Sequence, residues 1–327
     1  MRRASEDMIP NDDSRRLKRQ SNSTTTFDDP AQPSASETND PPGDIETGES
    51  TLVMLPTYNE IDNLEIIVRS LLTLAPALHL LIIDDSSPDG TGDLAERLRS
   101  EHPAKITVVH RPGKLGLGTA YVLGFRYALE NGYSRIVEMD ADLSHLPEQL
   151  PSILLASQGH GMALGSRYVK GGSTVKWGIH RKILSYTANL FVRKALGIPV
   201  MDATSGFRCY NRRVLEAIDL DTIHSKSYAF QIEMVWMCLR AGFDIKEVPI
   251  SFVERARGVS KISQNTVLEG LGTVFRLRGT MRNEKRTDRA ALISRELGRP
   301  TPSGEFQLAE GGGSQSAESL RDVRRSP

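Results

Sequence analysis

The sequence has little cysteine and no long unbroken apolar run. Its 327 residues include only two cysteines, Cys209 and Cys238, which argues against the disulfide framework of a small secreted domain. The longest nearly apolar stretch, Leu71–Ile83, is broken by a proline and a histidine and is too short to cross about 30 Å of hydrocarbon. Residues 1–19 are charged and lack the apolar core of a secretory signal. We therefore expect a cytoplasmic protein that does not span a membrane.

An excess of charge of one sign is also missing. The chain has 41 Lys and Arg against 41 Asp and Glu, so its formal net charge is zero. This balance does not favour a nucleic acid as partner, and any anionic ligand must be held by local clusters of Lys and Arg.

Large apolar side chains are scarce at both ends of the chain. Residues 1–50 are rich in Ser, Thr, Asp, Pro and Asn, a composition that cannot offset the entropy lost on ordering. Apolar periodicity is lost again from about residue 283, before the run Gly311–Gly313. We predict disordered tails at 1–50 and 283–327 around one folded domain, 51–282.

Inside that domain, short aliphatic runs alternate with segments of helical period. This pattern is typical of an α/β fold with a mostly parallel central sheet flanked by helices. The predicted strands are Thr51–Leu55, Leu80–Asp84, Ile106–His110, Arg135–Met139 and Met162–Gly165. The predicted helices are Ile61–Leu74, with an apolar stripe beginning at Ile61, and Thr91–Ser100, Thr119–Asn131 and Pro147–Ser157.

In open α/β sheets, ligands bind beyond the carboxyl ends of the strands, so the polar residues there are candidates for a site. After the first strand, Tyr58 could lie against a nucleotide base and Glu60 could accept hydrogen bonds from its amino groups. A capped helix start with Glu in its first turn explains the same residues. After the second strand, Asp85 could accept from ribose hydroxyls or the base, whereas Ser87 and Asp89 could serve only as helix caps.

The fourth predicted strand is followed by Asp140, Ala141 and Asp142. Carboxylates at i and i+2 can converge on one divalent cation, and hard oxygen ligands suit Mg²⁺ or Mn²⁺. The cation would take its remaining ligands from a diphosphate and water. Turn chemistry also produces Asp-x-Asp often, so the position after a buried strand is what favours a metal site.

Basic residues follow later in the domain. They are Arg167, the run His180–Lys182, Arg208, Arg255, Arg257 and Lys261. Individually such side chains are usually solvated, but together they suit two phosphorylated substrates, because Arg grips phosphate in bidentate fashion and Lys acts as a point charge.

The order of these motifs resembles the family 2 glycosyltransferases of the GT-A fold, in particular the polyprenol (dolichol) phosphate mannosyltransferases in their short form without transmembrane helices. The matching segments are Pro56–Glu60, Asp84–Thr91, Gly116–Ala120, Asp140–His145, Gly165–Tyr168, Thr204–Arg208, Tyr228–Glu233 and Arg255–Lys261. The likeness covers essentially all of residues 51–280.

The resemblance implies roles for individual residues. Pro56, Tyr58, Glu60, Ile83 and Asp85 are implied to contact the nucleotide of GDP-mannose, and Asp140, Ala141 and Asp142 to meet the metal and the diphosphate. Arg167 is implied to reach phosphate, and Arg255 and Lys261 to close over the donor or acceptor phosphate. Asp142, Arg167, Arg255 and Lys261 are accordingly the predicted catalytic set. Some relatives carry Gln where this chain has Ser144, whose shorter side chain is a weak candidate for a metal ligand.

The activity so implied is inverting transfer of mannose from GDP-mannose to a polyprenyl phosphate. A glucosyltransferase using UDP-glucose and a non-catalytic sugar-nucleotide-binding scaffold remain alternatives. The expected location is the cytoplasmic face of a membrane, reached directly or through a separate integral membrane partner.

Two amphipathic stretches bear on membrane contact. Gly178–Gly197 and Ile262–Leu277 each combine an apolar stripe with Lys or Arg side chains. Such helices can lie in a membrane interface, but both stripes could equally cover the sheet.

Overall fold

The structure is a computed structural model that describes residues 50–254 and 268–283. These residues belong to one compact unit, Ile45–Pro327. The predicted tails, 1–50 and 283–327, lie outside the described residues apart from Ser50 and Asn283, and so do Arg255 and Lys261.

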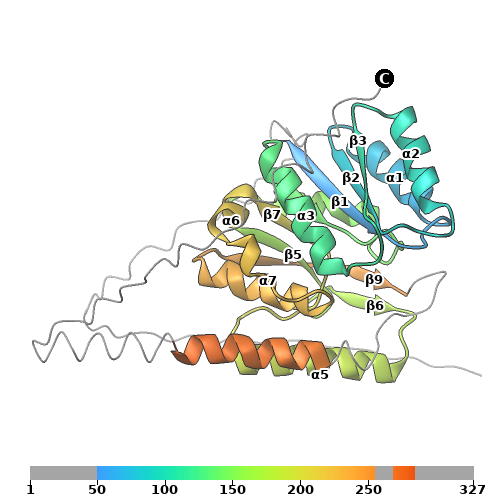
Figure 1. Cartoon of the computed structure of the whole chain (residues 1–327). Coiled ribbons are helices and arrows are strands. Elements are labelled where there is room, and N and C mark those ends of the chain that lie inside the picture. The colour runs from blue at the N-terminus through green and yellow to red at the C-terminus, as the bar shows by residue number, and fades with distance from the viewer. Residues whose placement is uncertain (1–49, 255–267, 284–327) are drawn as a thin grey trace, which may run out of the picture. The chain divides into compact units, whose positions relative to one another are not determined.

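A seven-stranded sheet in the order β3-β2-β1-β4-β7-β5-β8 forms the centre of the unit (Figure 1). Its strands are β1 Thr51–Thr57, β2 His79–Asp84, β3 Ile106–His110, β4 Arg135–Glu138, β5 Met162–Ser166, β7 Arg208–Asn211 and β8 Ile245–Pro249. All neighbours are parallel except β7, which runs antiparallel to β4 and β5. The mostly parallel α/β sheet is therefore confirmed. Strands β6 (Ser173–Val175) and β9 (Ser251–Val253) form a separate parallel pair.

Helices cover both faces of the sheet. They are α1 Leu64–Leu74, α2 Thr91–Glu101, α3 Leu117–Glu130, α4 Leu150–Ala156 after the 3₁₀ turn Pro147–Gln149, α5 Ile179–Leu196, α6 Arg212–Ala217, a 3₁₀ turn Leu220–Thr222 and α7 Ala229–Arg240. The helical residues 268–283 follow after the gap.

The first helix begins later than predicted. It starts at Leu64, and Ile61 is 42% exposed instead of leading the buried stripe. The reason lies in the neighbouring turn: the N–H of Glu60 donates to the Thr91 hydroxyl, and the N–H of Ile61 donates to Asp89. These bonds hold the chain in a turn before the helix can begin.

The alternation of side chains along the strands produces two cores. Leu52 and Met54 of β1 point into the core shared with α3, α5 and α7, whereas Val53 and Leu55 point into the core beneath α1, α2 and α4. Val274 and Leu277 of the segment 268–283 join the first core. The segment is thus packed on the same face of the sheet as α5 and α7.

The topology collects loops at one edge. Strands β1, β2, β4 and β5 share a direction, so the residues after them emerge at the same edge of the sheet. Because β7 runs the other way, the loop 202–207 that precedes it arrives at this edge too. Candidate residues from five segments therefore meet there.

Candidate active site

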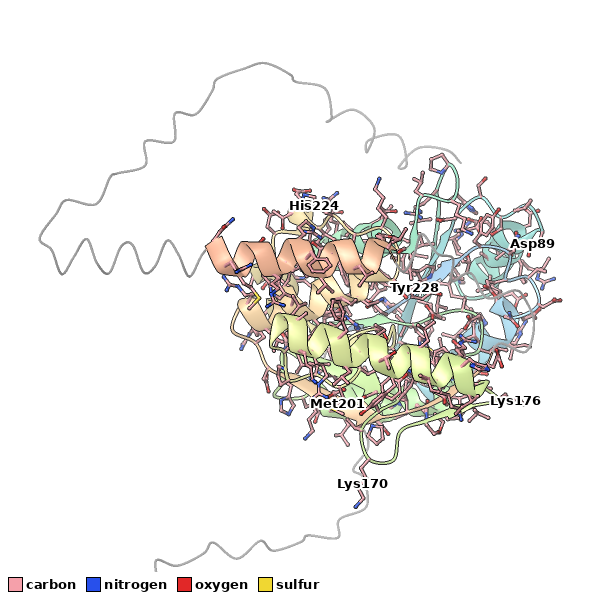
Figure 2. The ribbon with its side chains drawn as sticks, turned by 90° about the horizontal axis from the view of Figure 1, so that it is seen from below. Asp89, Lys170, Lys176, Met201, His224 and Tyr228 are labelled. Carbon is pink, nitrogen blue, oxygen red and sulfur yellow. The ribbon has the colours of Figure 1, made fainter. Side chains whose placement is uncertain are left out.

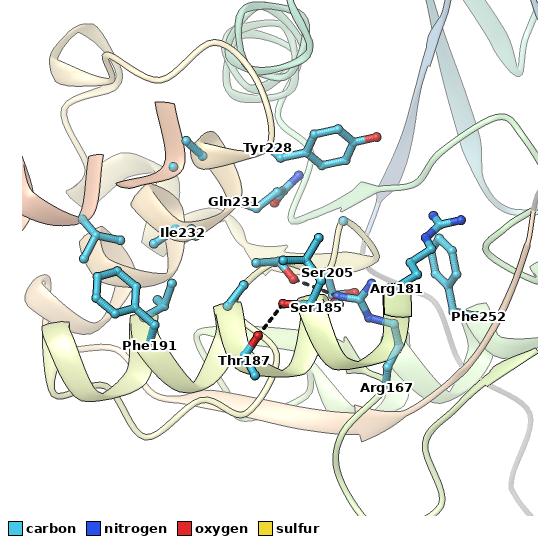
Figure 3. A pocket seen from close by; sticks show the side chains of 18 of the residues that line it. Arg167, Arg181, Ser185, Thr187, Phe191, Ser205, Tyr228, Gln231, Ile232 and Phe252 are labelled. Atoms are coloured by element: carbon cyan, nitrogen blue, oxygen red, sulfur yellow. Dashed lines mark hydrogen bonds between the residues drawn. The ribbon is translucent and has the colours of Figure 1, made fainter. Parts of the chain in front are cut away.

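A cavity of about 420 Å³ lies between this sheet edge and the pair formed by α5 and the helical residues 268–283 (Figure 3). Its polar lining includes Asp140, His145, Arg167, Arg181, Ser185 and Gln231, and its apolar lining includes Leu184, Phe191, Ile232, Leu271 and Val274. One cavity therefore joins charged groups to an apolar wall.

The acidic loop after β4 supplies the carboxylate end. Asp140 lines the cavity, and its backbone N–H donates to Nδ1 of His145 at 3.1 Å. Asp142 is buried and its Oδ1 accepts from the N–H of Ser144 at 3.0 Å. Ala141 is buried as well. Hydrogen bonds within the loop thus fix its shape. They leave Asp140 on the cavity lining and Asp142 buried beneath the surface.

A buried polar cluster that the sequence did not reveal stands behind this loop. Glu138 accepts from Gln231 Nε2 at 2.8 Å, and both side chains are buried. Burial raises the pKa of Glu138 to about 7, although the nearby Arg208 opposes the shift. Glu138 is the last residue of strand β4, and nothing in the sequence indicates that its side chain has a role beyond the sheet.

Arg208, which the sequence analysis grouped with the phosphate-binding cations, is instead occupied inside the protein. It is fully buried and donates to the backbone carbonyls of Ala203, Ser205 and Gln231 at 2.7 to 2.9 Å. A guanidinium is the only side chain with enough donors in a fixed plane to hold three carbonyls at once. Its role is to fix the loop that borders the cavity.

Arg167, a predicted phosphate ligand, lines the cavity but is held from behind by Asp202. Its Nε and Nη2 donate to the two carboxylate oxygens at 2.7 and 2.6 Å, and Nη1 takes no part in that pair. Burial is the largest influence and would lower the pKa of Arg167, but the charge and the hydrogen bonds of Asp202, together with smaller effects of Tyr168 and Asp140, outweigh it and raise the pKa. The guanidinium is thereby kept charged and fixed beside the cavity.

A second cation stands on the same wall. The guanidinium of Arg181, at the start of α5, lies 4.1 Å from the ring centre of Trp177 and donates to Glu254 at 2.9 Å. Ser185, one turn further along α5, accepts from the hydroxyl of Tyr168 at 2.7 Å. Figure 3 shows Arg167, Arg181 and Ser185 at the same end of the cavity.

The predicted nucleotide contacts lie along the neighbouring strands and outside the lining of the cavity. Pro56 is in β1, Tyr58 follows it with Lys114 Nζ 4.5 Å above its ring, and Glu60 accepts from Asn63 at 2.8 Å. The side chain of Ile83 is fully buried in the core, so only its backbone can face a ligand.

Asp85 has a partner that the sequence analysis missed. Arg111 donates to its two carboxylate oxygens at 2.5 and 2.6 Å, and also to Thr119 and to the carbonyl of Gly116. Arg111 directly follows β3, so the same strand-end rule would have found it. The pair ties the ends of β2 and β3 to the start of α3.

Metal-binding groups are few at this edge. In residues 50–254 and 268–283 no three His, Cys, Asp or Glu side chains are grouped so as to hold a metal ion. Of the two predicted ligands, Asp140 lines the cavity, whereas Asp142 is buried and is not among the lining residues.

The two amphipathic stretches do not use their whole apolar stripes to cover the sheet. Val192 and Leu196 of α5 are buried, but Ile183 and Leu184 are 55% and 57% exposed, and Phe275 on the neighbouring segment is 63% exposed. Figure 2 shows the two helices side by side on one face. No helix among the described residues has both the length and the apolar character needed for a membrane span.

Comparisons with known proteins show what the chain is similar to. The sequence matches glycosyl transferase family 2 over residues 52–219. It is 45% identical over 251 residues to polyprenol monophosphomannose synthase of Mycolicibacterium smegmatis, covering 74% of this chain and 95% of that protein. It is 47% identical over 225 residues to undecaprenyl-phosphate mannosyltransferase of Micrococcus luteus, covering 69% and 92%.

One similar solved structure is that of glucosyl-3-phosphoglycerate synthase from Mycobacterium tuberculosis, in complex with Mn²⁺, uridine diphosphate and glucosyl-3-phosphoglycerate. The TM-score is 0.51 at 20% identity, covering 71% of this chain and 81% of that one. This likeness shows the fold alone.

Proposed function

The chain belongs to glycosyl transferase family 2, and we propose that it transfers mannose from GDP-mannose to a polyprenyl phosphate. Two relatives of 45% and 47% identity carry names for this kind of reaction. The observation that carries the proposal is that Asp140, Arg167 and Arg181 line the same cavity as the apolar side chains of two helices.

The acceptor fits the cavity by its chemistry. A polyprenyl phosphate has an anionic head and an isoprenoid chain, so its site must change from cationic to apolar over a short distance. Arg167, Arg181 and the hydroxyl of Ser185 lie at one end, and Phe191 and Ile232 line the other (Figure 3). A cavity of about 420 Å³ is large enough for the head and the first isoprene units, since small-molecule pockets begin at about 300 Å³.

The donor would lie along the neighbouring strand ends. Tyr58 offers a ring face for the base, Glu60 a carboxylate for its amino groups, and Asp85 an acceptor for the ribose hydroxyls. Asp85 is held in place by Arg111, which supports a fixed contact point. The diphosphate would then reach Asp140 and Asp142, while Arg255 and Lys261, outside the described residues, would close over the phosphates.

The two carboxylates of Asp140 and Asp142 suit a divalent cation. Mg²⁺ is commonly bound by one or two carboxylates, with substrate phosphates and water as the other ligands, and Mn²⁺ accepts the same oxygen donors. Asp140 and Asp142 would supply the two carboxylates, and among the described residues no third His, Cys, Asp or Glu is grouped with them. When bound, the cation would neutralise charge on the departing diphosphate.

The transfer itself needs no protein base. The second pKa of a phosphate monoester is about 6, so the acceptor oxygen is largely ionised at neutral pH. That oxygen forms a bond to the anomeric carbon while the carbon–oxygen bond to the diphosphate breaks, and GDP leaves with the electron pair. Arg167 and Arg181 hold the two anionic reactants together, which is a gain in proximity and charge stabilisation. A single displacement inverts the anomeric carbon.

A lipid acceptor requires contact with a bilayer. Ile183, Leu184 and Phe275 are exposed apolar side chains on the helix pair that borders the cavity, so this pair would lie in the membrane interface. If a separate integral membrane partner recruits the chain instead, the purified protein will not float with vesicles.

The proposal is tested by supplying a short polyprenyl phosphate with Mg²⁺ or Mn²⁺ and either GDP-mannose or UDP-glucose. We expect a mannosylated lipid from GDP-mannose and little product from UDP-glucose. The reverse preference would favour a glucosyltransferase, and no product from either donor would favour a scaffold.

Arg181→Gln separates the acceptor role from donor binding. We expect its KM for polyprenyl phosphate to rise at least about tenfold, because a charge-assisted contact is lost, with little change in the KM for GDP-mannose. Arg97→Gln, an exposed cation on α2, serves as the matched control. An unchanged acceptor KM in Arg181→Gln would place the phosphate elsewhere.

A further inference from the structure

We propose that a groove at the far end of the helix pair binds the phosphate headgroup of an anionic bilayer lipid, at a site separate from the acceptor cavity. The groove has a volume of about 330 Å³. It is lined by Thr187, Leu190, Phe191, Lys194, Ala195 and Arg278. This inference rests on the proposed function, because a transferase with a lipid acceptor works at a bilayer, where anionic lipids are present.

The charge of the helix pair supports an anionic ligand. Helix α5 carries Arg181, Lys182, Arg193 and Lys194 and no acidic residue. Residues 268–283 carry three arginines and a single acid, Glu269, which is turned inward to the backbone of Lys226 and Ser227. The chain as a whole has a net charge of zero, so this face holds a local excess of positive charge.

Two of these cations do not line the groove, since Arg181 lies at the acceptor cavity and Arg276 is bonded to the body. Arg181 donates to Glu254, and Arg276 donates to the buried carboxylate of Glu233 at 2.8 Å. Lys194 and Arg278, in contrast, are exposed and line the groove from opposite helices. A phosphate between them would receive an ammonium and a guanidinium together, with the hydroxyl of Thr187 as a further donor.

The surroundings of the groove favour a lipid over a soluble anion. Phe191 borders both the groove and the acceptor cavity, and its ring centre lies 6.4 Å from that of Phe275. Phe275 and Leu271 are exposed beside it. A lipid headgroup brings its own acyl chains to such side chains, whereas inorganic phosphate leaves them in water.

A headgroup site at this position would orient the protein on the bilayer. The exposed apolar side chains Ile183, Leu184 and Leu271 precede Lys194 and Arg278 along the two helices. A headgroup held at that end would fix how the pair lies on the bilayer and so keep the acceptor cavity open towards the lipid.

Vesicle flotation of the full chain without donor or acceptor tests the site independently of catalysis. The vesicles are phosphatidylcholine alone, or phosphatidylcholine mixed with phosphatidylglycerol. The test variant is Lys194→Gln with Arg278→Gln. The control, Lys170→Gln with Lys182→Gln, removes the same charge from exposed positions that do not line the groove.

We expect the wild type to bind the anionic vesicles more tightly, and the test variant to lose at least about tenfold of that affinity, since two charge-assisted contacts to the same phosphate are removed. The control should lose less than half of its binding. Turnover of a detergent-dispersed short acceptor should be unchanged in the test variant. This assay shows whether the transfer reaction fails, independently of vesicle binding.

Equal losses in the test and control variants would show diffuse attraction and overturn the site. Equal binding of the wild type to both kinds of vesicle would overturn it as well. Release by inorganic phosphate, beyond that caused by chloride at the same ionic strength, would identify a soluble-anion site instead.

Discussion

Single residues set the shape of the acidic loop, and His145 is the clearest example. A backbone N–H can only donate, so Nδ1 of His145 must accept from Asp140 and a neutral ring carries its proton on Nε2. The ring is buried, stacked on Phe207 and met edge-on by Phe252. The imidazole therefore holds the backbone of Asp140 in one place.

This contact predicts a graded effect on metal binding. Asn has an acceptor oxygen close to the position of Nδ1, so His145→Asn should stay near the wild type, whereas His145→Leu should weaken Mn²⁺ binding about 10- to 100-fold, as losses behind metal ligands do. The dissociation constant is measured from the free Mn²⁺ signal in electron paramagnetic resonance, in the presence of GDP.

The control is His110→Leu, a change in a half-exposed histidine paired with Glu96. Equal weakening in His145→Asn and His145→Leu, or none in either, would contradict a positioning role for His145.

The candidate residues themselves were predictable because strand direction puts Tyr58, Asp85 and Asp140 at one edge, whatever the details of the loops. Their partners were not. Asp202 and Arg167 are 35 residues apart, and Arg111 and Asp85 are 26 residues apart. Such pairs form only when the loops are folded against each other, and no local pattern encodes them.

Among the elements, the segment 268–283 is joined to the body by its buried side chains Val274 and Leu277, by the bond from Arg276 to Glu233, and by Glu269. Glu269 accepts from the backbone N–H groups of Lys226 and Ser227 at 2.9 and 3.1 Å and from the hydroxyl of Ser227. Lys226 in turn accepts from the N–H of Gly118 at 2.9 Å. A Cβ on Gly118 would lie 2.5 Å from the carbonyl of Ser225, so only glycine permits this contact. The helix is thus joined to the start of α3.

Glu269 gives this attachment a pH dependence. Burial would raise the pKa of Glu269, but the hydrogen bonds from Ser227 and Lys226 outweigh it and lower the pKa below the usual 4.5. The native state therefore prefers the ionised form. Its stabilising contribution is complete above pH 4.5 and is lost as the pH falls through the native pKa.

Glu269→Gln should lower the free energy of unfolding at neutral pH by about 1 kcal/mol, because Gln keeps an acceptor but loses the charge. The difference from the wild type should shrink as the pH falls below the usual glutamate range. Urea unfolding across that range measures it, with Glu216→Gln, an exposed acid on α6, as control. A difference that grows in acid would contradict this account.

Elements were predicted well where the period is strong. The predicted strand Ile106–His110 agrees with β3 residue for residue. The antiparallel strand β7 was not predicted, because its four residues, Arg208–Asn211, include an arginine and an asparagine and show no clear alternation. The sequence left the role of α5 open, because a helix that covers a sheet and a helix that lies in a membrane interface have the same pattern of apolar residues.

At the scale of the whole molecule, the GT-A fold of family 2 is confirmed, and it carries the two regions to which the proposals assign function. The strand ends present the predicted nucleotide contacts, and the helix pair presents an apolar and basic surface, with the cavity between them. The family match ends at residue 219, so the segment 268–283 lies beyond it. The domain limits, 51 and 282, and the roles of Arg255 and Lys261 stay predictions.

The most direct test of this account is the anomeric configuration of the lipid product. GDP-mannose carries an α-linked sugar, and a single displacement by the acceptor phosphate across one cavity predicts a β-linked mannosyl phosphate. The one-bond coupling between C1 and H1, measured by nuclear magnetic resonance on product made from ¹³C-labelled donor, distinguishes the two. A β-linked product is the predicted result, and an α-linked product would contradict direct transfer between the two phosphates.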